Sequence, residues 1–383
     1  MQYSKKYLDG VQQFKDVMNF KHIDRVLHAS MFYTWKIFDS SYNGTLSHAL
    51  TDLNVLEDTQ CEFHERYHFD THMDLGTRNM LGPAMALGST HLSINDEEGT
   101  LNFHDHVIFE ENEYLEYAKD ELRFYWKMFC RKYPDVTIGQ VLHALVEFMS
   151  GGMFVKHMLT KFVEEYQAPA VHAQNIAGMV NVPIERIYKY YRGIRGTSLD
   201  FRRHKSEVKE CCDIIHEQEM LPRLKRGLAE DTTPFVTDTL TGLLAHATMN
   251  TKQWETFYWP YLKDYLDLII SSGKTITFFI ENSIGRFAEY FQDYPKGHII
   301  FFCEQDDIRE LRKKLPNVCL AGGMPTNLLG NGTPEECVDY AKRLIDDMGD
   351  GFILSQDKMI SFKNDCKREN IWAVCDYVSN FRW

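Results

Sequence analysis

The sequence predicts an α/β fold built on a parallel sheet, either a doubly wound sheet or a closed barrel. Short β-rich apolar runs alternate with helical stretches through the C-terminal half, which indicates repeated βα units. The chain has 383 residues, of which 44% are hydrophobic, so it can form a large core. It contains no G-x-G-x-x-G or G-x-x-x-x-G-K-S/T loop, which counts against a nucleotide-binding sheet.

Four β-rich runs mark the expected strands of the C-terminal half, at residues 275–280, 298–302, 318–321 and 351–354. Helical spacing follows at residues 285–291, 306–314 and 369–380. A further helix opens at Thr333, a capping residue that is followed by Pro334 and two acidic residues. The N-terminal half is expected to be mostly helical, with helices over 111–133 and 138–166 and a hairpin-like turn in 92–100.

Composition and charge exclude several partners. The net charge of −13 argues against nucleic acid and against an anionic membrane surface as the main partner. The N-terminus lacks the apolar segment of a secretory signal, and we find no run of about 18 apolar residues that would span a membrane. The nine cysteines include no C-x-x-C pair. We therefore expect a cytoplasmic protein with mostly reduced thiols.

Residues directly after the expected strands are the candidates for chemistry. If the sheet closes into a barrel, reactive groups lie at the carboxyl ends of its strands. This rule selects Glu281, Asn282, Cys303, Glu304, Gly323, Met324, Ser355 and Asp357.

Several segments, in order along the chain, carry motifs of a known family. Residues 319–337, CLAGGMPTNLLGNGTPEEC, resemble the GN-x-P…LL…GTPEEV signature of the uroporphyrinogen decarboxylase superfamily. Residues 351–355, GFILS, and 369–373, ENIWA, resemble its GGFIL-S strand and its ENLKA helix. Asp24-Arg25 resembles its early DRVP motif, and residues 191–203 and 257–263 resemble blocks of its longer, methyltransferase-like members.

The resemblance implies a (β/α)8 TIM barrel with additional N-terminal helices and a small hairpin. It further implies a single domain over residues 1–383, in which residues 1–135 form the N-terminal elaboration that leads into the barrel.

The superfamily has two main chemistries, and the N-terminal residues favour one of them. One branch decarboxylates uroporphyrinogen and grips its carboxylates with an Arg-rich block. Here residues 32–36 are Phe-Tyr-Thr-Trp-Lys, aromatic where a polyanionic substrate needs guanidinium groups. The resemblance therefore implies the other branch, a corrinoid-dependent (cobalamin-dependent) methyltransferase of the O-demethylase type. Such an enzyme moves a methyl group from a small methylated donor to the Co(I) of a corrinoid held by a partner protein.

The donor and the metal stay open at this point. The aromatic blocks favour an aryl methyl ether, while a methylated amine or thioether is also compatible. Zinc-binding members carry a His-x-Cys and a later Cys, but the matching positions here are 279–281, Phe-Ile-Glu, and Lys358, which counts against Zn²⁺. If a metal is bound, we expect Glu281, Cys303 and Asp357 to be its ligands. The alternatives are a decarboxylase and a non-catalytic barrel subunit, and a homodimer is compatible with each.

Glu281 is the first candidate for the acting residue. Methyl transfer leaves an electron pair on a heteroatom, which departs readily only when it is protonated or bound to a Lewis acid. Glu281 follows six residues of a β-rich apolar run, whose desolvation favours a protonated carboxyl. As a general acid it would contribute roughly 10²–10⁴-fold. The alternative is an ion pair with Arg286 or Lys358.

Glu304 and His246 are the further catalytic candidates, each with a structural role as the alternative. The substrate-binding candidates are Phe257, Tyr258, Trp259, Met324 and Lys358. For the three aromatic residues the alternative is core packing. His64, His68 and His72 are spaced four residues apart, which predicts one face of a solvated helix, with a metal-binding stripe as the alternative.

Overall fold

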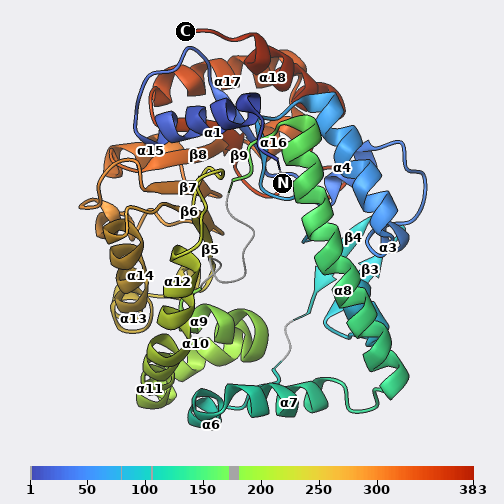
Figure 1. The fold of residues 1–383 in the computed structure, drawn as a ribbon, viewed down its shortest axis with the longest axis vertical. Helices are drawn as coiled ribbons and strands as arrows, with labels where there is room; N and C mark the ends of the chain where they lie inside the picture. The colour runs from blue at the N-terminus through green and yellow to red at the C-terminus, as the bar shows by residue number, and fades with distance from the viewer. Residues whose placement is uncertain (1, 79, 105–106, 172–180) are drawn as a thin grey trace.

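A computed structural model describes residues 2–78, 80–104, 107–171 and 181–383. Its centre is a seven-stranded parallel sheet that curls into a half-barrel, with the order β2-β1-β9-β8-β7-β6-β5 (Figure 1). The expected α/β fold of the TIM-barrel type is confirmed. The strands are β1 Leu27–Ser30, β2 Thr71–His72, β5 Thr239–Leu243, β6 Ile276–Ile280, β7 Ile299–Cys303, β8 Cys319–Met324 and β9 Phe352–Gln356.

The four strands predicted in the C-terminal half are present, but the run predicted to end at residue 321 continues through Gly322 and Gly323. The strand runs on to Met324. At Gly322 the φ angle is 145°, and a Cβ atom there would lie 2.8 Å from the carbonyl oxygen of Cys303. Gly322 therefore lets β8 pass close to β7, and Gly323 leaves room for the side chains of Ile308 and Leu344.

Helices cover the outer face of the sheet in the C-terminal half. Thr333 caps α17 as predicted, in a reciprocal capping box with Glu336. The helix predicted over 285–291 is wrong: only a short 3₁₀ turn forms, because the Asp306 carboxylate accepts the backbone N–H groups of Ile284 and Gly285 and holds them in a loop. The elements are η4 Ala245–Thr248, α13 Thr251–Phe257, α14 Trp259–Ser271, η5 Ala288–Phe291, α15 Ile308–Lys314, α16 Thr326–Asn331, α17 Pro334–Met348 and α18 Arg368–Asn380.

The N-terminal half is mostly helical, and the predicted hairpin is confirmed as the antiparallel pair β3 and β4. We call the segment from α5 to α8 the N-terminal arm. It extends from the sheet along α8 and returns through α7 toward α11 (Figure 1). The elements are α1 Lys5–Met18, α2 Trp35–Asp39, α3 Leu46–Ala49, α4 Leu53–Tyr67, α5 Gly82–Ala86, β3 Leu92–Asn95, β4 Thr100–Phe103, α6 Tyr114–Lys119, α7 Glu121–Lys132, α8 Ile138–Lys161 and η1 Phe162–Tyr166.

Between the arm and β5 lies a helical block that contacts the arm. Helix α11 packs against α6, and together they close the molecule opposite the sheet. The elements of this block are α9 Pro183–Arg186, η2 Ile187–Tyr191, α10 Gly193–Arg203, α11 Lys205–Ile215, η3 His216–Met220 and α12 Leu221–Leu228.

The predicted histidine face is wrong. Helix α4 ends at Tyr67, His68 adopts the left-handed conformation that terminates it, and His72 belongs to β2. His64 and His72 are nevertheless neighbours: their ring nitrogens Nδ1 and Nε2 lie 2.9 Å apart, and both side chains are buried. The spacing indicated that these histidines lie close together, but His72 reaches His64 from a strand and not from the same helix.

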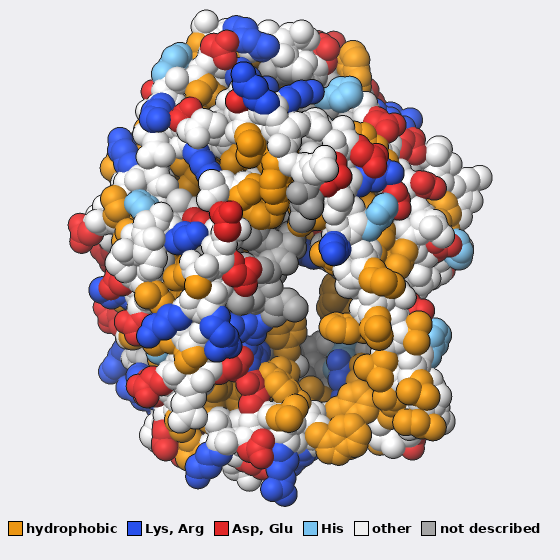
Figure 2. Space-filling view, in the orientation of Figure 1, with side chains coloured by type: hydrophobic (Ala, Val, Ile, Leu, Met, Phe, Trp, Pro, Cys, Tyr) orange, Lys and Arg blue, Asp and Glu red, His pale blue; other side chains and the backbone are white. Residues whose placement is uncertain are grey.

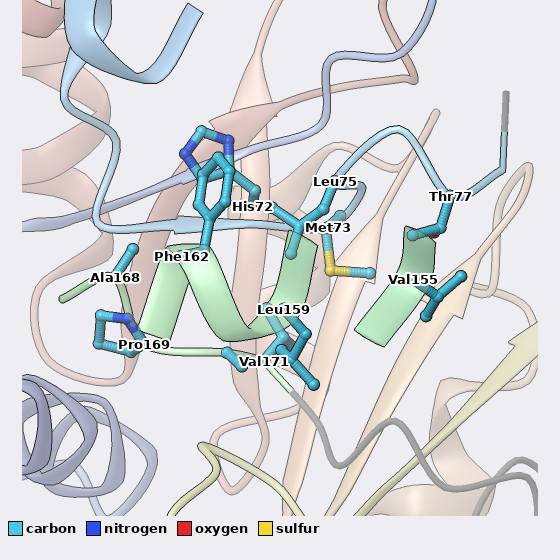
Figure 3. Close-up of a pocket in the computed structure, with 11 residues that line it drawn as sticks. His72, Met73, Leu75, Thr77, Val155, Leu159, Phe162, Ala168, Pro169 and Val171 are labelled. Carbon is cyan, nitrogen blue, oxygen red and sulfur yellow. The ribbon is translucent and has the colours of Figure 1, made fainter. Parts of the chain in front are cut away.

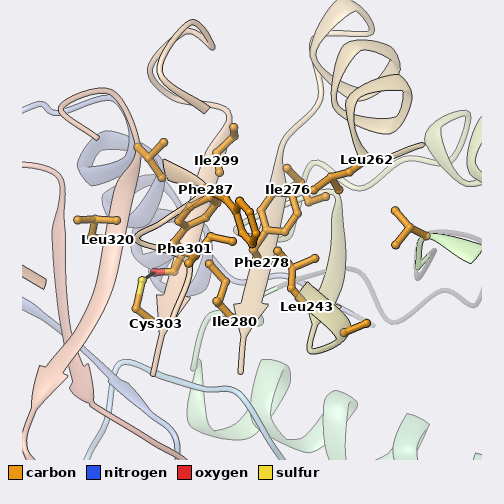
Figure 4. Packing of buried hydrophobic residues seen from close by; sticks show 14 of the residues in the cluster. Leu243, Leu262, Ile276, Phe278, Ile280, Phe287, Ile299, Phe301, Cys303 and Leu320 are labelled. Carbon is orange, nitrogen blue, oxygen red and sulfur yellow. Dashed lines mark hydrogen bonds between the residues drawn. The ribbon is translucent and has the colours of Figure 1, made fainter. Parts of the chain in front are cut away.

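The sheet separates two apolar layers. Side chains alternate along the strands. Phe279 and Phe302 pack in the barrel interior. Phe278 and Phe301 pack against the helices outside, as Figure 4 shows. Burial of one such side chain contributes about 1.5–3 kcal/mol. This alternation decides which residues after the strands point inward.

Helix α8 has an unexpected composition. With η1 it forms a 29-residue helix whose mean hydropathy and length are sufficient to cross a membrane, whereas the sequence shows no uninterrupted apolar run. The glycines, the serine and the histidines of this segment interrupt its apolar residues, but they lower its mean hydropathy only slightly. One such helix is weak evidence for a membrane span.

Candidate active site

A cleft of about 800 Å³ opens beside the carboxyl ends of β5 and β6. Its inner wall carries Phe279 from β6, Glu281 directly after β6, and Lys189 from η2. The opposite wall is formed by the N-terminal arm, and the space-filling view shows the molecule hollowed between the two (Figure 2). The position agrees with the rule that barrel enzymes build sites at strand ends.

Strand register brings Glu281 and Glu304 side by side. Ile280 pairs with Cys303, so the two glutamates follow neighbouring strands at the same level. The N–H of Glu304 donates to the carbonyl of Ile280 at 3.2 Å, which continues the ladder past the strands. Two of the three predicted catalytic residues therefore lie together.

Glu281 forms an ion pair with a residue that the sequence did not suggest. The Lys189 ammonium lies 3.3 Å from the Glu281 carboxylate and 3.4 Å from that of Glu185. Gly242 leaves room for this ammonium, since a Cβ atom there would lie 3.4 Å from Lys189 Nζ. The predicted partners are engaged elsewhere: Arg286 donates to the carbonyl of Ala247, and Lys358 pairs with Asp365.

Glu185 organises the loop after β5. Its carboxylate is fully buried and accepts the N–H groups of Leu244 at 2.7 Å and Ala245 at 2.9 Å. The Tyr258 hydroxyl donates to the same oxygen at 2.5 Å. The i, i+4 spacing of Glu185 and Lys189 was the one sequence signal that could have drawn attention to this pair.

Glu304 is held less tightly and is only partly buried. Its two carboxylate oxygens accept the N–H groups of Asn282 and Met359, both at 3.2 Å. Burial raises the pKa of Glu304, the two N–H donors oppose this, and the charges of Glu281 and Asp357 add to the rise. Glu304 thus places a carboxyl of raised pKa beside the Glu281–Lys189 pair.

Arg78 adds a second cation to the cleft. Its guanidinium donates to the Tyr33 hydroxyl at 2.8 Å and lies 5.4 Å from the centre of the Phe279 ring. The side chain lines the cleft and is exposed to solvent there. The sequence offered no signal for Arg78, because the segment around it matches no strand or helix pattern.

The predicted aromatic slot lies in the core instead. Phe257 stacks on Phe201 with ring centres 4.8 Å apart, and Trp259 packs edge-on against Phe291 at 5.5 Å. The aromatic side chains that do line the cleft are Phe103, Tyr133, Tyr188, Tyr190 and Phe279.

The remaining candidates do not converge with Glu281. Met324 is buried at the end of β8, and Asp357 accepts the N–H and hydroxyl of Thr326. Cys303 belongs to the outer apolar layer, and burial raises its pKa well above the usual value. The three residues expected to hold a metal thus have separate surroundings, and this donor set does not fit a zinc ion.

One group of three potential ligands occurs among the described residues, at Glu111, Asp200 and His204. The Arg192 guanidinium already donates to Asp200 at 2.7 Å and lies 3.6 Å from Glu111. The Tyr114 hydroxyl donates to Asp200 as well, at 2.7 Å. An ion-pair network therefore accounts for this group.

A second cavity lies at the inner end of α8, between His72, Leu159 and Phe162 (Figure 3). Its volume is about 30 Å³. That is room for about one or two water molecules and not for a substrate.

His246 is buried at the end of β5, near Glu185 and Arg286. Burial lowers its pKa to about 4, so the folded protein keeps the imidazole neutral. The unfolded chain takes up a proton near the ordinary pKa of about 6.5, so stability is lost as pH falls from there toward the folded pKa.

As the pH falls from 6.5 to 5.5, we expect protonation of His246 in the unfolded chain to lower the free energy of unfolding by about 1 kcal/mol. In urea unfolding, the free energy of unfolding of His246→Asn should therefore change less between the two pH values than that of the natural protein does, by the same amount. His143→Asn, on an exposed histidine, is the matched control and should change nothing. An unchanged difference in His246→Asn would refute the assignment.

Comparison with known proteins gives the fold independent support. No protein-family model matches the chain, and no curated protein sequence matches it. Among solved structures, a methyltransferase from Methanosarcina mazei is similar over 97% of this chain and 98% of that chain, with a TM-score of 0.60 and 11% identical residues. The two chains share a fold. The overlap includes the N-terminal arm as well as the sheet, since it covers nearly the whole chain.

Proposed function

We propose that the protein is a methyltransferase of the uroporphyrinogen decarboxylase superfamily that uses a small methylated donor. The observation that carries the proposal is the pair Glu281 and Glu304, side by side at strand ends next to a cleft of about 800 Å³. The similar structure from Methanosarcina mazei is itself described as a methyltransferase. We further propose that the donor is an aryl methyl ether and that the acceptor is the Co(I) of a corrinoid on a partner protein.

The cobalt of such a partner would supply the nucleophile for the methyl carbon. The bond between that carbon and the donor oxygen then breaks, and its electron pair stays on the oxygen. This chain has to stabilise that oxygen, because a free phenolate is a poor leaving group. Glu304 would supply the proton for this task, since burial raises the pKa of its carboxyl.

Lys189 and Glu281 complete the proposed machinery. Glu281 borders the cleft and would relay the proton toward the oxygen, while the Lys189 ammonium stabilises negative charge at the same place. Tyr188, Tyr190 and Phe279 give the cleft aromatic walls against which an arene can pack. The convergent polar groups argue against the non-catalytic alternative.

The proposal is tested by a visible-spectrum assay with a reduced corrinoid protein and a panel of methylated donors. We expect the spectral change of methylated cobalt only when this chain and a methoxyarene are both present. Methylamines and methyl thioethers are the comparison donors. If one of these is turned over and the methoxyarenes are not, the donor belongs to that class instead. Carbon dioxide release from uroporphyrinogen would favour the decarboxylase.

A further inference from the structure

An apolar stripe runs along the outward side of α8. Ile138, Leu142, Leu145, Met149 and Gly152 follow one another at spacings of four, three, four and three residues. The first four side chains are 54% to 75% exposed. This is the heptad spacing by which a helix presents a continuous seam to a second helix. We call these five residues the α8 seam.

The α8 seam lies within a larger apolar surface. Val146, Phe148 and Met153 flank it, and Leu122 and Trp126 on α7 extend it, all with more than half of their surface exposed. Figure 2 shows apolar side chains gathered over the lower part of the arm. Only 11% of the most apolar window of this helix is buried. A monomeric protein rarely leaves a contiguous apolar patch of this size in water.

The extent of this surface fits a stable protein interface. Nine large apolar side chains are more than half exposed here, on α8 and α7. With on the order of 100 Å² from each, the surface approaches the roughly 800 Å² per partner that stable complexes bury. Permanent interfaces are also more apolar than transient ones.

We infer that the α8 seam binds the α8 seam of a second copy of this chain. The protein carries a net charge of −13, so most of its surface repels a second copy. The α8 seam is different, because none of its five residues is charged. In an antiparallel pair centred on Leu145, the Leu145 side chain of each copy faces that of the other.

Gly152 supports close approach of two helices. A Cβ atom at this position would meet no atom of the described residues within 4 Å, so the space beside it is open. A groove of about 280 Å³ runs next to it between α8 and α5, bordered by Phe148 and Gly151. A side chain from the facing helix can fill this groove. A partner that must dissociate in every reaction cycle, such as a corrinoid protein, is poorly matched to so apolar a surface.

Pairing of the seams bears on the cleft described above. Lys132 and Tyr133 at the end of α7, and Phe103 of β4, form part of its wall. They belong to the same arm that carries the α8 seam. A dimer therefore holds this wall in place from outside.

Sedimentation velocity on the full chain tests the inference. We expect the natural protein to sediment as a dimer at micromolar concentration. The double variant Leu145→Glu, Met149→Glu places like charges in the seam and should raise the dissociation constant at least about 100-fold. Trp372→Glu, on an exposed residue of α18, is the matched control and should remain dimeric. Circular dichroism checks that each variant is folded.

Cross-linking provides a measurement that does not weaken the interface. In a Cys130→Ser background, which removes the one cysteine that is exposed, Leu145→Cys should form a covalent dimer on mild oxidation, and Leu8→Cys should not. A monomer at micromolar concentration would overturn the inference. So would a dimer that the double variant leaves intact. Co-sedimentation of a monomer with phosphatidylglycerol vesicles, lost in the double variant, would reassign the seam to a membrane surface.

Discussion

Glu281→Gln should reduce methyl transfer by roughly 10²–10⁴-fold while the protein stays folded. The substitution removes the proton-relaying carboxyl and leaves the amide too weakly polar to balance the Lys189 ammonium, 3.3 Å away. The rate of methyl transfer to the reduced corrinoid protein, at saturating donor, is the measurement. The expected effect lies in kcat, because the carboxyl acts on the departing oxygen and not on donor binding.

Two further variants separate the contributions at this site. Glu281→Asp keeps the charge but shortens the side chain and should retain more activity than Glu281→Gln. Glu289→Gln, an exposed glutamate in η5, is the control and should leave the rate unchanged. If Glu281→Gln turns over at the natural rate, the carboxyl pair does not take part in the reaction, and the role of Glu304 has to be reconsidered with it.

Glu185→Ala should lower the free energy of unfolding by about 3–5 kcal/mol, the usual cost of removing one partner from a buried ion pair. The change leaves the Lys189 ammonium beside Glu281 alone and deprives Leu244, Ala245 and Tyr258 of their common acceptor. Chemical denaturation followed by tryptophan fluorescence measures the loss.

The matched control is Glu210→Ala, which removes an exposed glutamate from α11. It should change the free energy of unfolding by less than about 0.5 kcal/mol. A loss in Glu185→Ala no larger than in this control would show that the loop after β5 does not depend on the buried carboxylate.

The parallel sheet was predictable because its strands are buried on both faces. Such strands are read as continuous β-rich apolar runs, as in residues 276–280 and 299–303. The start of α17 was also predictable, because its capping residues Thr333 and Glu336 are only three residues apart in the sequence. The missing helix at 285–291 was not predictable, because Asp306 controls that segment from a later part of the chain.

The candidate site was predictable only in part. Glu281 and Glu304 follow directly from strand ends and from register. Lys189 reaches Glu281 across 92 residues of sequence, from a helical block with no strand pattern. Phe257 and Trp259 carry the right chemistry for an arene but lie on helices whose apolar faces pack into the core. The type of a side chain identified a site residue only where the strand pattern also indicated which way that side chain points.

The neighbour relations of β1 have a consequence for biosynthesis. This strand lies between β2 and β9, and the N–H of Trp383 donates to the carbonyl of Asp24 just ahead of it. A nascent chain on the ribosome therefore has an open strand edge at β1 until β9, which ends at Gln356, has been translated. Closing so long a loop is slow, and exposed edges attract other chains. We expect folding of the sheet to depend on the docking of β9 onto β1.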